Sequence, residues 1–164
     1  MKQTILLFTL SAFLFTACSK DEIDQEQPVI NMTAAVGFPQ NCDTLWAGDS
    51  FTFTALFTDN QELGSFSIEI HENFDHHAHS TETEACELMP EKEPVNPFQF
   101  LNDFSIPQGL TKYEAGITIN IPDSVNNAPI DAGDYHFFIS LTDREGWSTQ
   151  KGIALKILHK QPST

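Results

Sequence analysis

The feature that most constrains the fold is a strict alternation of apolar and polar residues, repeated in several separate runs. In residues 50–58, Phe51, Phe53, Ala55 and Phe57 are predicted to point to one side and the threonines between them to the other. This is the two-residue period of a β-strand that is buried on one face. No segment keeps a helical period over a useful length. The sequence therefore predicts an all-β protein.

Strand-like character is found in six segments, namely 29–36, 50–58, 65–71, 112–121, 133–142 and 150–158. Turn signals rich in glycine, aspartate and proline separate them. The last two segments, joined by a turn over residues 143–147, resemble the end of immunoglobulin-like bacterial modules. Strands of this kind pack as two facing sheets. We therefore predict one immunoglobulin-like antiparallel β-sandwich over residues 28–160.

One connection is far longer than the others. Residues 72–111 separate the predicted strands 65–71 and 112–121, and this insertion is acidic and rich in His and Glu. Residues 98–106 within it could form a further short strand. The sequence does not predict the course of residues 80–111 as a whole.

The N-terminus has the pattern of an export signal. A short basic start precedes an apolar stretch over residues 5–15, which is too short to span a bilayer. The small Ala17 then stands directly before Cys18, which resembles the lipobox of bacterial lipoproteins. That resemblance implies that residues 1–17 are removed and that Cys18 is lipidated. The alternative is an ordinary secretion signal with an incidental cysteine.

Residues 18–27 are predicted to be the lipid anchor and a solvated linker. The tract Ser19-Lys20-Asp21-Glu22 resembles the tag that sends Bacteroidetes lipoproteins to the outer face of the outer membrane. We therefore expect a surface-exposed chain that is anchored to the cell outer membrane. The formal net charge of −15 argues against nucleic acid as a partner, because such a surface repels phosphate.

Two cysteines remain besides the predicted lipid site. Cys42 and Cys86 are expected to pair as a disulfide, since two thiols in an oxidising compartment usually do. Metal ligation by the two thiolates is the alternative.

A histidine-rich segment carries the strongest chemical signal. His71, Asp75, His76, His77 and His79 lie close together and include four of the six histidines. Neutral imidazole is a leading ligand of zinc, copper and nickel, and a carboxylate can complete the ligand set or orient an imidazole. A solvated loop or a pH-sensitive switch would use the same residues.

The predicted topology adds one more histidine to this segment. Strands 65–71 and 133–142 should be antiparallel neighbours, which places His71 beside His136 on the face opposite the core. His159 directly follows the last predicted strand, at the same end of the sandwich, but we do not expect it to be a ligand. The candidate metal ligands are therefore His71, His76, His77, His79, His136 and Asp75. Zinc is the expected metal, with copper or nickel as alternatives.

The His71–His79 run, on a lipidated immunoglobulin-like chain, resembles a Bacteroidetes lipoprotein family classed as domain-of-unknown-function family 4625. The resemblance covers most of the mature chain. It implies an outer-membrane lipoprotein and transition-metal handling, and it supplies no established activity.

Two functions compete at this stage. The first is a surface lipoprotein that captures a divalent transition metal and delivers it, for instance to an outer-membrane transporter. The second is a structural or adhesion module that binds a surface protein. We do not expect an enzyme, because the sequence has no nucleophile motif, phosphate-binding loop or His-Glu-x-x-His helix. Asp123, Asp131, Asp134 and Asp143 could be considered for calcium, but their spacing does not fit a calcium-binding loop.

Overall fold

The computed structural model describes residues 24–33, 35–78, 81 and 86–161. These residues form β-strands and loops and contain no helix, so none of them belongs to a helix that could cross a membrane. The strands are β1 (Val29–Asn31), β2 (Asp43–Trp46), β3 (Ser50–Thr58), β4 (Leu63–Glu72), β5 (Phe100–Ser105), β6 (Lys112–Asn120), β7 (Ser124–Val125), β8 (Ala128–Pro129), β9 (Gly133–Asp143) and β10 (Ser148–Leu158). The predicted signal peptide and Cys18 lie outside the described residues.

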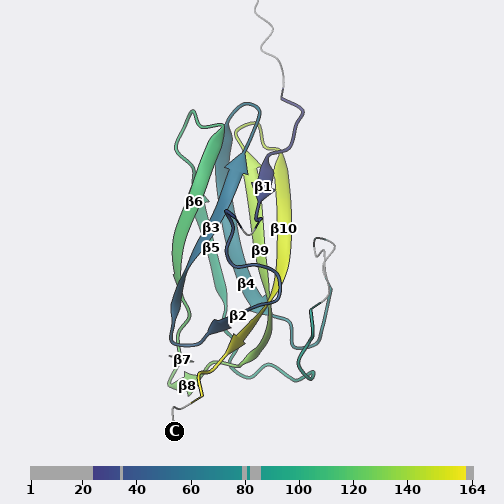
Figure 1. The fold of residues 1–164 in the computed structure, drawn as a ribbon, viewed down its shortest axis with the longest axis vertical. Helices are drawn as coiled ribbons and strands as arrows, with labels where there is room; N and C mark the ends of the chain where they lie inside the picture. Colours follow the sequence, from purple (N-terminus) through teal and green to yellow (C-terminus); the bar gives the residue numbers. More distant parts are fainter. Residues whose placement is uncertain (1–23, 34, 79–80, 82–85, 162–164) are drawn as a thin grey trace, which may run out of the picture.

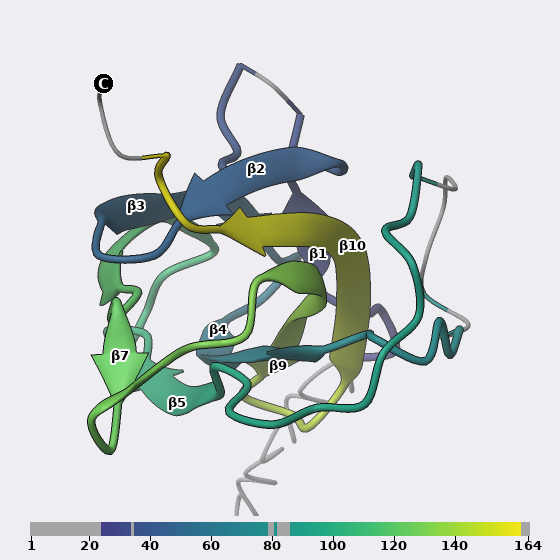
Figure 2. The same ribbon diagram turned by 90° about the horizontal axis from the view of Figure 1, so that it is seen from below.

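The strands form two main sheets, as the alternation predicts (Figure 1). One sheet has the order β1-β3-β6 and the other has the order β2-β10-β9-β4-β5, while β7 and β8 pair separately. All pairs are antiparallel except β2 with β10, which is parallel. Figure 2 looks along the strands from the end where β7 lies. The fold is thus the predicted all-β sandwich.

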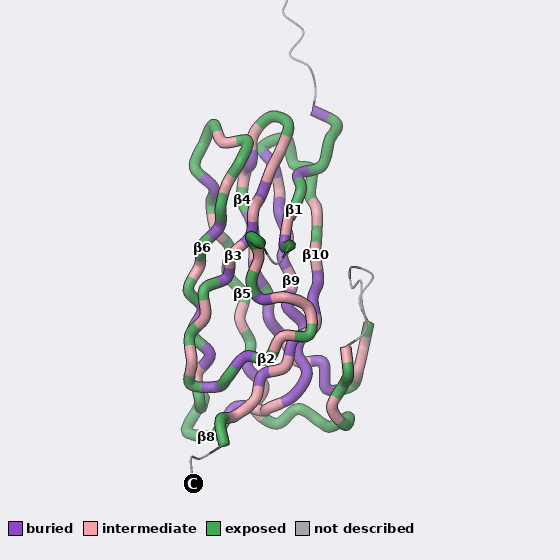
Figure 3. Tube along the Cα trace, viewed as in Figure 1, coloured by how far each residue is buried: buried purple, intermediate pink, exposed green. Residues whose placement is uncertain are grey.

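The core lies between the sheets and consists of the inward side chains of the alternating strands. Figure 3 shows the buried residues along the backbone trace. Ile68 and Ile70 of β4 and Phe137 of β9 are almost completely buried. Phe53 of β3 meets Phe137 across the sandwich, with 5.6 Å between the ring centroids. Each such buried side chain stabilises the fold by about 1.5–3 kcal/mol. Because these residues point inward, their sequence neighbours on β4 and β9 must face outward.

Two strands of the main sheets differ from the sequence-based expectation. The first strand ends at Asn31 rather than continuing to residue 36, because the amides of Val36 and Gly37 bond back to Thr33 and form a turn. Strand β2 was not predicted. The strand expected at residues 98–106 is present as β5, and it pairs with β4, so it widens the five-stranded sheet. Between β4 and β5, the described residues contain no regular element.

Candidate metal centre

The pairing of β4 with β9 brings two histidines together. His71 lies directly opposite His136 in the antiparallel register, on the face away from the core. Their ring centroids are 5.4 Å apart. The alternation of both strands fixes this arrangement, because Ile70 and Phe137 occupy the inward positions. The structure thus confirms the predicted juxtaposition of these two imidazoles.

The chain that follows β4 is held firmly against the start of β9. The amide of Asn73 donates to the carbonyl of Asp134, which extends the strand pairing by one bond. Phe74 is buried and meets Tyr135 edge to face at 5.3 Å. It lies directly over Gly133, where a Cβ atom would come within 2.5 Å of the Phe74 ring. Glycine at position 133 therefore permits the contact that directs the loop.

This loop then turns back and places a third imidazole over the first two. His76 adopts a left-handed backbone conformation, with φ of 55°. The ring of His77, which follows it, lies 4.9 Å from that of His136 and 5.7 Å from that of His71, centroid to centroid. The loop also covers His136, which is completely buried although it faces away from the core.

His71, His77 and His136 together form what we call the histidine cluster. Each offers one ring nitrogen, and these three nitrogens lie within 4.8 Å of one another. The side chains of His71 and His77 are 22% and 37% exposed, so an ion could reach the cluster from the solvent side. Three converging imidazoles are a ligand set that zinc, copper and nickel accept.

An oxygen atom lies close to one ring nitrogen of each histidine. Nδ1 of His77 is 2.5 Å from Oδ1 of Asp75, and Nε2 of His136 is 3.1 Å from the carbonyl oxygen of His77. Nδ1 of His71 is 3.1 Å from Oε1 of Glu69, in a close contact that does not have the geometry of a hydrogen bond. Metal-binding histidines almost always have such an oxygen partner, which fixes the ring and its tautomer. The geometry thus gives Asp75 an orienting position rather than a ligand position.

The contact with His77 also affects Asp75 itself. The hydrogen bond from the His77 ring is the main cause that holds the pKa of Asp75 below its ordinary value. Asp75 is therefore ionised at neutral pH. A carboxylate in this state makes the His77 ring a better electron donor to a metal.

The remaining candidate histidines lie elsewhere. His76 does not join the cluster, because its Nδ1 is 3.5 Å from Oε1 of Glu91 and its Nε2 is 3.8 Å from Oδ2 of Asp134. His79 lies outside the described residues. The Nε2 atom of His159 is 2.8 Å from the carbonyl oxygen of Ile130. Of the sequence-predicted ligands in the described part, the structure brings together His71, His77 and His136.

The predicted disulfide is present and joins Cys42 to Cys86. Cys42 immediately precedes β2, and Cys86 lies in the insertion beyond the histidine-rich segment. The amide of Cys42 donates to the carbonyl of Ala154 in β10, so the bridge is anchored to the five-stranded sheet. Thiolate ligation by this pair is therefore excluded while the bridge is intact.

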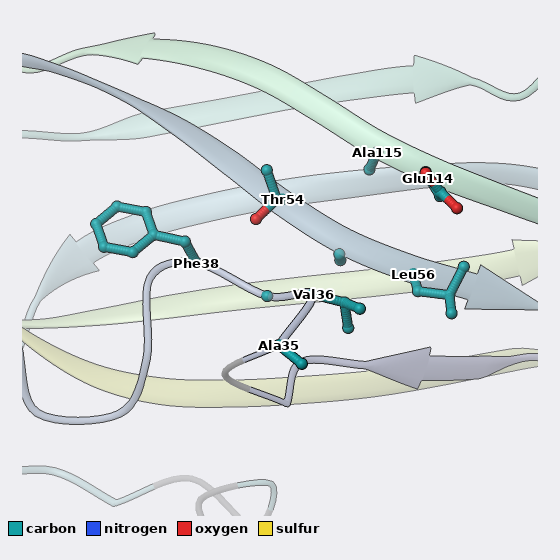
Figure 4. A pocket seen from close by; sticks show the side chains of 9 residues that line it. Ala35, Val36, Phe38, Thr54, Leu56, Glu114 and Ala115 are labelled. Atoms are coloured by element: carbon teal, nitrogen blue, oxygen red, sulfur yellow. The ribbon is translucent and has the colours of Figure 1, made fainter.

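Two hollows of the described surface differ in their position relative to the histidine cluster. One of about 540 Å³ lies against β3 and β6, between Phe38 and Leu56 (Figure 4). Among the described residues that line it, Glu114 is the only charged one. A smaller hollow of about 250 Å³ adjoins the histidine cluster itself, with His71 and Phe138 in its wall.

The comparisons with known proteins place the chain in a family without an assigned activity. The family model described as "Domain of unknown function (DUF4625)" matches residues 16–158, which confirms the family resemblance seen in the sequence. No curated protein matches the chain. Among solved structures, the sporulation control protein Spo0M from Bacillus subtilis is similar at 8% identity and a TM-score of 0.38. The match covers 83% of this chain, and the chain spans about half the length of that protein.

Proposed function

We propose that this chain, which belongs to the DUF4625 family of unknown function, binds a divalent transition metal ion through His71, His77 and His136. The convergence of three ring nitrogens within 4.8 Å is the observation that carries the proposal. Zinc is the first expectation, and copper and nickel are the alternatives. His76, His79 and Asp75 were also predicted as ligands. His76 lies beside Glu91, away from the cluster, and His79 lies outside the described residues, while Asp75 would orient His77.

The oxygen contacts support the same proposal. Histidines that only share a polar surface do not need their second ring nitrogens fixed, whereas metal ligands do. Here Oδ1 of Asp75 lies within hydrogen-bond distance of Nδ1 of His77, and the carbonyl oxygen of His77 lies within hydrogen-bond distance of Nε2 of His136. The carboxylate of Glu69 lies close to Nδ1 of His71. The negative carboxylates also offset the charge of a bound cation.

A three-histidine site suits reversible capture. Zinc sites with three protein ligands keep a fourth position for water or another ligand. A donor group from a receiving protein could enter at this position, from the half-exposed side of His77. We propose that the chain is a surface lipoprotein of the outer membrane, anchored through Cys18, that captures the metal and passes it to a transporter or another surface protein.

Calorimetric titration of the chelator-stripped chain with zinc, copper and nickel tests the proposal. We expect one equivalent to bind with a Kd below about 1 μM, or about −8 kcal/mol. His77→Ala should weaken this binding more than about 100-fold, which exceeds the effect typical of losing an orienting partner. His159→Ala is the matched control, since it removes a histidine outside the cluster, and should bind as the wild type does.

The opposite result has a clear meaning. If the wild type binds no metal more tightly than His77→Ala does, the histidine cluster is not a metal site. A stable protein partner recovered from the outer membrane would then favour the adhesion module as the function.

A further inference from the structure

A second group of metal-ligating side chains lies at the opposite end of β4 and β9. Asp59 stands between β3 and β4, Asp143 is the last residue of β9, and Asp24 precedes β1. One carboxylate oxygen from each of the three lies within 4.8 Å of those from the others. We call these residues the aspartate cluster. Asp143 lies seven positions after His136 along β9, or about 24 Å at about 3.4 Å per residue.

Each carboxylate of this cluster has one oxygen that is held by N–H donors of the protein. Oδ1 of Asp24 accepts from the amide of Glu26 at 3.0 Å and from the side chain of Asn60 at 2.9 Å. Oδ1 of Asp143 accepts two backbone amides of the following turn, at 2.6 and 2.8 Å. Oδ2 of Asp59 accepts one backbone amide, at 2.9 Å. The three side chains are thus fixed in place.

The other oxygen of each carboxylate is buried and has no hydrogen-bond partner: Oδ2 of Asp24, Oδ1 of Asp59 and Oδ2 of Asp143. Asp24 and Asp143 are only 3% and 4% exposed. Among the described residues, no lysine, arginine or histidine forms an ion pair with any of the three. A buried carboxylate oxygen without a partner costs free energy, and a cation bound between the three residues would satisfy all three such oxygens.

The oxygen ligands of the aspartate cluster indicate which kind of cation it would bind. The cluster offers three carboxylates and no imidazole or thiolate, which suits hard cations with oxygen ligands. Calcium accepts six to eight oxygens in a flexible arrangement, so water and backbone carbonyls can complete its shell.

The surrounding backbone shows why the three residues can meet. Gly64 allows β4 to approach β9 closely, since a Cβ atom there would come within 2.6 Å of the Asp143 carbonyl oxygen. The Trp147 indole donates to the carbonyl of Asp24 at 3.0 Å, which holds the segment before β1 over the turn after β9. We infer that Asp24, Asp59 and Asp143 bind a calcium ion, which fastens this segment to the ends of β4 and β9 independently of the histidine cluster.

Terbium luminescence tests the inference on the purified full chain. Terbium replaces calcium at oxygen sites and emits when a nearby indole is excited, and Trp147 adjoins the aspartate cluster. We expect sensitised emission that saturates at one equivalent and is reversed by calcium. Asp59→Asn should weaken terbium and calcium binding at least about tenfold, whereas the matched control Asp103→Asn, an exposed carboxylate of β5, should not. Equal emission from both variants would overturn the inference.

Thermal unfolding provides a second readout that does not depend on fluorescence. Saturating calcium should raise the Tm of the wild type by about 5 °C or more relative to a calcium chelator. In chelator, Asp59→Asn should melt at or above the wild type, because one of three crowded charges is gone. In calcium, it should melt below the wild type. A wild-type Tm that does not respond to calcium would refute the calcium site. The proposed zinc site would not be affected by that result, because the zinc titration tests it separately.

Discussion

The two ends of the β4–β9 pair are built alike and carry opposite chemistry. At one end, His71 and His136 face each other and a loop adds His77. At the other end, Asp59 and Asp143 approach each other and the segment before β1 adds Asp24. In both clusters two ligands lie on a strand or directly beside the end of one, and the third comes from a covering segment. The same scaffold thus offers nitrogen ligands at one end and oxygen ligands at the other.

The clusters also differ in the hydrogen-bonding groups that surround their ligand side chains. At the histidine cluster, an oxygen atom lies close to one ring nitrogen of each histidine. At the aspartate cluster, N–H donors hold one oxygen of each carboxylate, and the other oxygen is buried without a donor. A soft-to-borderline metal is expected at the first and a hard one at the second. The comparison teaches that ligand type, rather than strand geometry, separates the two proposed sites.

The largest effect should come from removing the disulfide near the histidine cluster. The Cys42→Ser/Cys86→Ser variant releases a bridge between residues separated by 44 positions. We expect the free energy of unfolding to fall by about 2–4 kcal/mol, measured by denaturant titration. Calcium affinity of the folded variant should not change, because the aspartate cluster lies at the far end. Equal weakening of zinc and calcium binding would show that the two ends are not independent.

A smaller effect is expected from Asp75→Asn. The amide cannot hold the His77 ring as the carboxylate does, and zinc affinity should fall about 10- to 100-fold by calorimetry. Calcium binding should stay at its wild-type value. Glu91→Gln is the matched control, since Glu91 lies beside His76, outside the histidine cluster. If Asp75→Asn binds zinc as tightly as Glu91→Gln does, Asp75 does not orient His77.

The smallest effect concerns acid stability of the metal-free chain. Asp75 and Asp24 both have a pKa below the ordinary value of about 3.9, the first through the His77 ring and the second through the Glu26 amide. Their contributions to stability are therefore complete above about pH 4 and are lost as the pH falls through the lowered values.

Carboxyl titration by NMR separates these two causes. In His77→Ala, the pKa of Asp75 should return toward its ordinary value while that of Asp24 stays low. A pKa of Asp75 that does not move in this variant would contradict the assigned hydrogen bond.

Much of the scaffold could be predicted from the sequence, and the reasons are physical. Alternation in residues 65–71 and 133–142 fixes which side chains face the core, and neighbouring antiparallel strands then place His71 beside His136. Strand β2 is too short to show a period, and its parallel pairing with β10 depends on contacts far apart in the chain. The partner of β5 likewise depends on the packing of whole sheets.

The loop residues were less predictable. Nothing in the local sequence shows that the backbone turns left-handed at His76, so that His77 rather than His76 reaches His136. The aspartate cluster was missed although part of its signal was available. Asp59 and Asp143 each adjoin the end of a predicted strand at the same end of the sandwich, and the reasoning that joined His71 to His136 would have joined them too. The position of Asp24 beside the other two depends on the course of the N-terminal segment, which no sequence pattern predicts.

The most direct test is X-ray absorption spectroscopy at the zinc edge, on the chain loaded with one equivalent of zinc in the presence of excess calcium. Calcium should fill the aspartate cluster, and zinc should occupy the histidine cluster. The account predicts three imidazole nitrogens at about 2.0–2.1 Å from the zinc ion. A shell of oxygen ligands alone, without the outer scattering of imidazole rings, would contradict it.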